Sequence, residues 1–124
     1  MQSKIIFLLV LILIGSASAF TGYWSTENNI TLTASSPEII RGGHASWSQT
    51  ITLSDPGLNT TAREVINRYN HIQIVKAASG KKIICNGTAY DQISTVTQYG
   101  WVRLVPLDTT NHLAVVLRGT WTGA

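Results

Sequence analysis

The chain has 124 residues, of which only nine are Lys or Arg and six are Asp or Glu. The basic residues are scattered and the aromatic residues are not interleaved with them, which argues against a nucleic-acid-binding groove despite the sequence pI of about 9.3. One cysteine excludes an intrachain disulfide framework, so a packed core has to provide the stability.

Residues 1–19 predict a secretory signal peptide. Met1–Lys4 is short and basic, residues 5–14 are apolar, and Ala17-x-Ala19 supplies the small residues that a signal peptidase requires. The alternative is a retained membrane anchor, but a helix needs roughly 20 apolar residues to cross a bilayer. We therefore expect an extracellular or cell-surface product, with residues 20–124 as a single domain and no membrane span after cleavage.

The first half of that domain has the composition and alternation of β-strands. Residues 30–34 alternate, Ser35–Pro37 interrupts the pattern, and residues 38–41 resume it before a Gly-Gly turn. Residues 45–54 alternate strictly, which places Trp47, Gln49, Ile51 and Leu53 on a core-facing side and hydroxyl groups on the other. Gln49 is the one polar residue on the core side and needs a hydrogen-bond partner if it is buried.

One segment breaks the strand pattern. Leu58, Ala62, Val65, Ile66 and Tyr69 follow a helical stripe, and a capping-box spacing begins the segment. The pattern predicts one short helix near residues 60–70.

The second half returns to strands. Residues 71–77 and 82–85 predict a hairpin, and residues 99–105 predict a central strand that Pro106 closes. In residues 112–121, alternation predicts that Leu113, Val115, Leu117 and Trp121 share one face.

The stretch "IICNGTAY" predicts a tight hairpin, because Asn-Gly is the strongest two-residue turn signal and strand-like residues flank it. With Asn86 and Gly87 at the turn, Cys85 pairs with Thr88, and its thiol points inward as a small apolar side chain. We therefore predict a buried, unreactive Cys85 and an exposed Asn86.

These segments favour a mainly β fold: a two-sheet antiparallel β-sandwich of about seven strands, with the short helix near 60–70. The stretch "ITLTASSPEIIRGGHASWSQTITL" resembles the opening strands of immunoglobulin-like domains of secreted prokaryotic surface proteins. The resemblance covers 24 residues, lacks the Cys and Trp spacing of antibody-type domains, and implies a surface role without naming functional residues.

No motif in the sequence predicts catalysis, a metal site or a cofactor. The three histidines lie far apart with no ligand spacing, the serines include no nucleophile elbow, and the acidic residues fall mostly in turns. Cys85 with His71 or His112 is the remaining dyad that distant segments could assemble. We therefore expect a protein that is not an enzyme.

Two sets of residues are candidates for modification or binding. The first comprises the N-glycosylation sequons at Asn29, Asn59 and Asn86, which would suit an archaeal secreted protein. The second comprises the aromatic residues expected to face a ligand, which are Tyr23, Trp24 and Tyr99. The other three tryptophans, Trp47, Trp101 and Trp121, are expected in the core.

The sequence thus predicts a non-catalytic structural or interaction domain in an envelope layer, in adhesion or in assembly. Its partners would be other surface proteins or like subunits, and the candidate strand within Phe20–Ala34 could add to a neighbour's sheet edge. The first alternative is a small carbohydrate-binding module, and the second is a small secreted hydrolase.

Overall fold

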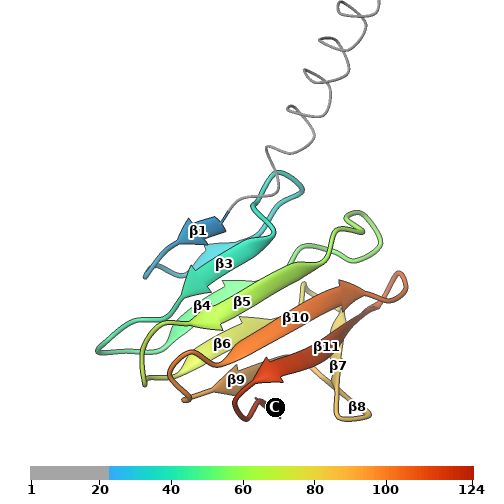
Figure 1. The fold of residues 1–124 in the computed structure, drawn as a ribbon. Coiled ribbons are helices and arrows are strands. Elements are labelled where there is room, and N and C mark those ends of the chain that lie inside the picture. The colour runs from blue at the N-terminus through green and yellow to red at the C-terminus, as the bar shows by residue number, and fades with distance from the viewer. Residues whose placement is uncertain (1–22) are drawn as a thin grey trace, which may run out of the picture.

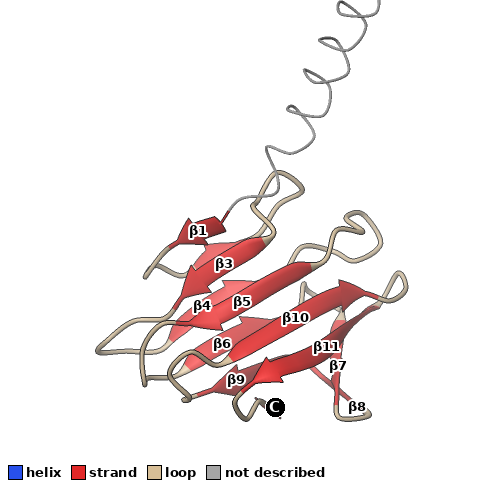
Figure 2. Ribbon diagram, viewed as in Figure 1, coloured by secondary structure: helices blue, strands red, loops and turns tan. Residues whose placement is uncertain are grey.

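The computed structural model describes residues 23–124, which form two β-sheets packed face to face and contain no helix (Figures 1 and 2). The predicted signal peptide and its cleavage site lie outside the described residues. Sheet A has seven strands in the spatial order β1 (Tyr23–Ser25), β3 (Ile39–Gly42), β5 (Arg63–Asn67), β10 (Trp101–Pro106), β11 (Asn111–Arg118), β7 (Lys82–Cys85) and β8 (Thr88–Tyr90). Sheet B has five, in the order β12 (Thr122–Gly123), β9 (Gln92–Thr95), β6 (Gln73–Lys76), β4 (Gln49–Thr52) and β2 (Ile30–Thr31).

The predicted β-sandwich is confirmed, but the prediction that it is antiparallel is wrong for its first half. Strands β1 to β6 alternate between the two sheets, so each strand lies beside the strand two places earlier and runs in the same direction. As a result β1, β3 and β5 pair in parallel in sheet A, and β2, β4 and β6 do so in sheet B. The stretch that resembles immunoglobulin-like domains lies here, and its parallel pairing departs from the antiparallel pairing of that family.

The predicted helix near 60–70 is wrong, because residues 63–67 form β5. Side chains alternate along β5, and Val65 is fully buried between Ile40 of β3 and Val102 of β10. Strand β5 pairs with a neighbour on each side, so its backbone groups are satisfied within the sheet. A helical stripe of a few residues is weaker than this pairing, and β-branched Val65 and Ile66 also favour a strand.

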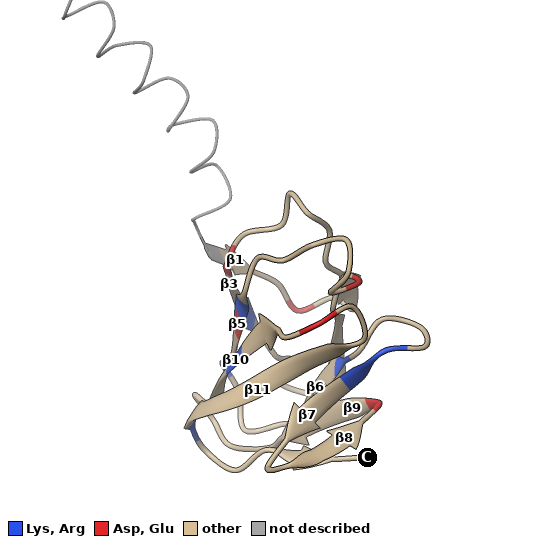
Figure 3. Ribbon diagram, turned by 90° about the vertical axis from the view of Figure 1, so that its right-hand side faces the viewer, with Lys and Arg blue, Asp and Glu red and all other residues tan. Residues whose placement is uncertain are grey.

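The core lies between the two sheets and is aliphatic with one large aromatic residue. Its buried hydrophobic members are Leu32, Ile40, Ile51, Leu53, Val65, Val75, Ala77, Ile83, Cys85, Ile93, Val102, Leu104 and Trp121. Both sheets contribute members by strict alternation, as expected where two sheets interdigitate. Lys and Arg are spread over both layers, with no single basic cluster among the described residues (Figure 3).

The Asn-Gly hairpin is confirmed. Strands β7 and β8 are antiparallel, Cys85 pairs with Thr88, and the turn residues Asn86 and Gly87 have φ angles of 51° and 82°. Cys85 is 1% exposed, whereas Asn86 is exposed at the tip. Side-chain parity therefore separates the buried thiol from the adjacent sequon.

The hairpin predicted from residues 71–77 and 82–85 is wrong. Strand β6 belongs to sheet B and β7 to sheet A, so the turn at Gly80 carries the chain from one sheet to the other. Strand β6 pairs instead with β4 and β9, whereas β7 pairs with β11 and, across the Asn-Gly turn, with β8.

The C-terminal strands confirm two expectations and overturn one. Strand β10 is central in sheet A and ends at Pro106, as predicted. Leu113, Val115 and Leu117, however, do not face the core with Trp121: Val115 and Leu117 are 39% and 48% exposed. The register with β10 and β7 directs His112 inward instead, and Trp121 enters the core beyond the end of β11.

No helix within residues 23–124 is long and apolar enough to cross a membrane.

Candidate functional site

Four loops meet at one end of the sandwich, here called the loop end. Strands β1, β3 and β5 run parallel, so the loops that follow them (26–29, 43–48 and 68–72) emerge on the same side (Figure 1). Strand β10 runs antiparallel to β5, so the loop that precedes it, 96–100, begins there too. Loops held by a rigid scaffold are where binding residues are commonly found.

Buried amide side chains hold the loops of the loop end in place by hydrogen bonds to their backbone. Gln49 is completely buried, and its Oε1 accepts a hydrogen bond from the backbone N–H of Gly43 at 2.8 Å. Its Nε2 donates to the carbonyl oxygen of Asn28 at 2.7 Å. The expectation that Gln49 needs a partner is confirmed, and these two bonds join the loops after β1 and β3.

Asn67 does the same for the other two loops. Its side chain is fully buried, and its Nδ2 donates to the carbonyl oxygens of His71 at 3.0 Å and Thr97 at 3.1 Å. The backbone N–H of Tyr99 donates to the Asn67 carbonyl oxygen at 2.6 Å. Asn67 therefore holds the loops 68–72 and 96–100 against each other.

A third buried amide, Gln73, lies beside Gln49 in sheet B. Gln73 is the register partner of Gln49, and its Nε2 donates to the Gln49 carbonyl oxygen at 3.1 Å. Gly42 lies above both side chains, and a Cβ there would stand 2.5 and 2.6 Å from the Oε1 atoms of Gln73 and Gln49. Glycine at position 42 thus makes room for the buried amides.

Two aromatic side chains project from the fixed loops. Tyr99 is 54% exposed and has a φ of 62°, a left-handed conformation that is costly for a bulky residue. Trp47 is 61% exposed and stacks on His44, with ring centroids 3.6 Å apart and planes 17° apart. The prediction of an exposed Tyr99 is confirmed, whereas the prediction that Trp47 lies in the core is wrong, because β4 starts only at Gln49.

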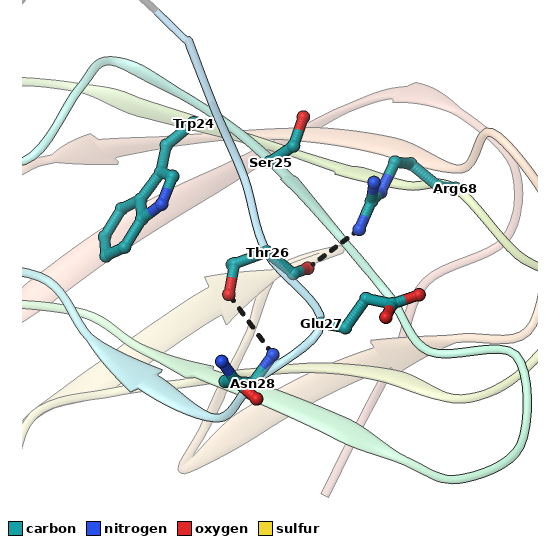
Figure 4. Close-up of a pocket in the computed structure, with 6 residues that line it drawn as sticks. All are labelled: Trp24, Ser25, Thr26, Glu27, Asn28 and Arg68. Carbon is teal, nitrogen blue, oxygen red and sulfur yellow. Dashed lines mark hydrogen bonds between the residues drawn. The ribbon is translucent and has the colours of Figure 1, made fainter.

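An open depression borders the loop end beside β1 (Figure 4). Its lining residues are Trp24, Ser25, Thr26, Glu27, Asn28 and Arg68. The Arg68 guanidinium donates to the carbonyl oxygens of Thr26 at 3.1 Å and Gly42 at 3.2 Å, so the charge is held in place by the backbone.

Glu27, on the rim of the depression, accepts a hydrogen bond from the Tyr69 hydroxyl at 2.8 Å. That bond raises the pKa of Tyr69, because it stabilises the protonated phenol. The Arg68 guanidinium lies 5.4 Å from the centre of the Tyr69 ring. Backbone atoms, a carboxylate, a phenol and a guanidinium therefore form one connected polar rim.

The predicted ligand-facing residues have different positions. Trp24 is 40% exposed in the edge strand β1, and it lines the depression rather than pairing with Tyr99. The backbone of Tyr23 pairs with Ile39, and its side chain lies outside the description. Of the expected core tryptophans, Trp121 is buried, while Trp101 is half-buried and donates from Nε1 to Glu64 at 2.7 Å.

Sequence reasoning missed the polar rim. Glu27 lies 42 positions before Tyr69, and no local motif joins it to Arg68 and Tyr69. The sequence does contain one indication of the loop end, which is Gln49. An amide on the core side of a strand, beside a Gly-Gly turn, indicates loops whose backbone groups need hydrogen bonds from the core.

The residues considered for catalysis do not form a site. His44 and His71 each accept a hydrogen bond from a nearby backbone N–H, those of Ser46 and Ile72, while His112 is buried in the core. The thiol of Cys85 contacts the carbonyl oxygen of Trp121 at 4.0 Å. Within residues 23–124, no group of three or more His, Cys, Asp or Glu side chains could hold a metal ion.

We predict that Cys85 reacts with a thiol reagent only when the protein unfolds. Burial raises the pKa of this thiol, which is the opposite of the activation that a catalytic thiolate requires. The rate of modification by an aromatic disulfide should follow the rate of global opening and rise steeply in denaturant. A matched control is Ser79→Cys in a Cys85→Ala background, which places the thiol in an exposed turn and should react at once. Rapid modification of native Cys85 would revive the hydrolase alternative.

Comparison of the chain with models of protein families and with curated protein sequences finds no match.

Proposed function

We propose that this protein is a secreted or cell-surface, non-catalytic interaction domain that binds its partner through the loop end. The observation that carries the proposal is the set of buried amides beneath exposed loops. The side chains of Gln49 and Asn67 form hydrogen bonds with backbone carbonyl and N–H groups of four loops. Loops ordered in advance lose little conformational entropy when a partner binds.

The strained conformation of Tyr99 supports the same conclusion. A left-handed φ at a tyrosine costs about 1–3 kcal/mol, and such residues cluster where function requires them. Tyrosine is also enriched at protein interfaces because its ring is large, rigid and polar at one end. Other surface proteins or copies of this chain are therefore the proposed partners.

Carbohydrate is the second candidate partner, and the position of Trp47 favours it. The indole remains 61% exposed although it stacks on His44, so it offers a flat, supported ring to a sugar. The exposed Glu27 and Asn28 and the half-buried Arg68 provide the hydrogen-bonding groups that sugar hydroxyls need. Among the described residues, His44 and Trp47 form the one stacked aromatic pair, so a row of coplanar exposed rings does not extend from it.

The test measures binding of the purified protein to cell-envelope preparations from its source. We expect Tyr99→Gly and Trp47→Ala each to weaken binding at least about tenfold, as loss of an interface aromatic does. Because glycine adopts φ of 62° without strain, Tyr99→Gly should leave the free energy of unfolding unchanged or raise it by up to about 1 kcal/mol. Weaker binding without lower stability separates a binding role from a structural one.

Leu58→Ser is the matched control, because Leu58 is 87% exposed in the loop before β5, at the opposite end of the sandwich. Protease treatment of the envelopes should abolish binding to a protein partner, and periodate treatment should abolish binding to a carbohydrate. If Tyr99→Gly and Trp47→Ala bind as tightly as the parent, the loop end is not the binding surface.

A further inference from the structure

The three N-glycosylation sequons differ in what the fold leaves accessible. Asn59, in the loop between β4 and β5, is only 8% exposed. Its Nδ2 donates to the Ser54 hydroxyl at 3.0 Å, and its Oδ1 accepts from the Thr61 backbone N–H at 3.1 Å. A glycan on Nδ2 must extend into solvent, so a chain modified at Asn59 would have to bring this buried nitrogen to the surface and give up its bond to Ser54.

Asn29 is exposed, but its side chain already takes part in the fold. Its Oδ1 accepts a hydrogen bond from the backbone N–H of Thr50 at 2.8 Å, which ties the start of β2 to β4. A glycan on its Nδ2 is compatible with that bond, although the side chain is not free to move. The fold therefore neither excludes nor singles out Asn29.

Asn86 differs from both. It lies at the tip of the β7–β8 hairpin, is exposed, and within residues 23–124 its side chain forms no hydrogen bond. An added Cβ at the neighbouring Gly87 would meet nothing within 4 Å, so the space around the turn is open. Thr88, whose hydroxyl completes the sequon, is exposed as well. Amide and hydroxyl are therefore both presented to solvent.

We propose that Asn86 is a site of N-glycosylation in this protein and that Asn59 carries no glycan in the folded chain. The proposal rests on the secreted or cell-surface location proposed above. In the reaction, Asn86 Nδ2 forms a bond to the anomeric carbon of a lipid-linked oligosaccharide, supplied with its transferase by the export pathway. The bond from that carbon to the lipid phosphate oxygen breaks, the phosphate leaves with the electron pair, and a base of the transferase takes the amide proton.

The glycan would occupy one defined edge of the molecule. Strand β8 is the last strand of sheet A and, within residues 23–124, has no partner on its outer side. A hydrophilic oligosaccharide at the start of β8 would hinder pairing of this free edge with another strand, a need that natural sheets meet by several devices. Strand β1, at the other edge of sheet A, would be untouched.

The test uses the full chain with its own leader, secreted from yeast, with Thr31→Val included throughout to remove the Asn29 sequon. Intact mass before and after glycosidase treatment, and peptide mapping, report occupancy in the secreted fraction. We expect one glycan on the parent, complete loss of it in Thr88→Val, and no change in Thr61→Val. Valine is β-branched like the threonine that it replaces, and both substitutions leave the asparagine of the sequon in place. The turn and the Asn59 contacts therefore stay intact.

A secreted, leader-cleaved parent without a glycan, or a glycan mapped to Asn59, would overturn the proposal. Retention of the chain inside the cell with its leader uncleaved would instead contradict the proposed location. A second version, in which a yeast leader replaces residues 1–19, keeps the glycan test valid in that case. The same criteria apply to it: a glycan lost in Thr88→Val supports the proposal, and its absence from the parent overturns it.

Discussion

Replacing Gln49 by leucine will lower the free energy of unfolding by about 2–3 kcal/mol, because it leaves the buried Gly43 amide without an acceptor. The Asn28 carbonyl loses its donor too, but Asn28 is exposed, so water can replace that bond. Leucine fills nearly the same volume, so the loss reports hydrogen bonding rather than a cavity. Urea denaturation measures the change.

The same substitution should loosen the loop end before it unfolds the protein. Exchange of the Gly43 amide proton with solvent should quicken by more than the global destabilisation explains, because the opening is local. Binding through Trp47 and Tyr99 should weaken in parallel. Gln92→Leu is the matched control, since Gln92 is half-buried on the outer face of sheet B and should change stability by less than about 0.5 kcal/mol. Equal effects of the two substitutions would show that Gln49 does not hold the loops.

The buried amides explain why a polar residue lies on the core side of a strand at all. A loop of about five residues cannot satisfy its own backbone groups by regular pairing, and burying them unpaired is costly. Long amide side chains reach from the strands to these groups and supply both a donor and an acceptor. In this fold four loops at the same end need such hydrogen bonds, because the parallel pairing of the strands brings successive loops together.

Local signals predicted the parts of this fold that depend on neighbours in sequence. The alternation around Ile51 and Leu53, the Asn-Gly turn and the closing proline of β10 each follow from geometry within a few residues. The burial of Cys85 followed from the turn alone, because a two-residue hairpin fixes the face of each flanking side chain. The prediction of a two-sheet sandwich needed only strand composition.

Pairing between distant strands could not be predicted in this way. No local sequence pattern indicates that β3 lies beside β5, about 25 residues later. None indicates that β6 and β7, joined by a short turn, belong to different sheets. The helix predicted at residues 60–70 fails for the same reason: two flanking strands, 20 or more residues away, complete the hydrogen bonds of β5. Strands β1 and β2 already pair within the chain. This pairing argues against the hypothesis that a strand within Phe20–Ala34 adds to the sheet of a neighbouring subunit.

The candidate site was predicted only in part. Trp24 and Tyr99 are exposed, as predicted, but the two belong to different features of the surface. The polar rim of Glu27, Arg68 and Tyr69 exists only because the loops after β1 and β5 emerge side by side. This arrangement depends on the parallel order of the strands, which no single segment of the sequence indicates.

Acidification from about pH 6.5 to pH 4 should cost this protein up to about 3 kcal/mol of stability through His112. His112 is 3% exposed at the end opposite the loops, and its Nδ1 has no hydrogen-bond partner within the described residues. Burial lowers its pKa to about 4, with Asp55 raising it and Arg63 lowering it by smaller amounts. The unfolded chain, whose histidine titrates near 6.5, therefore binds the proton more readily in this range and gains stability relative to the folded state as pH falls.

His112→Leu removes the titrating group, so its free energy of unfolding should vary much less than the parent's between pH 6.5 and pH 4.5. The lowered pKa values of Asp91 and Asp108 act in the same direction, but only nearer pH 4 and below, where carboxylates accept protons. His71→Asn, a change at a half-buried loop histidine, should keep the acid dependence of the parent and serves as the control. Urea denaturation at several pH values separates the cases, since a slope that persists in His112→Leu would assign the acid sensitivity to other groups. Because His112 and Arg63 share the end of the sandwich opposite the loops, acid should open that end first and leave the Gln49 hydrogen bonds in place.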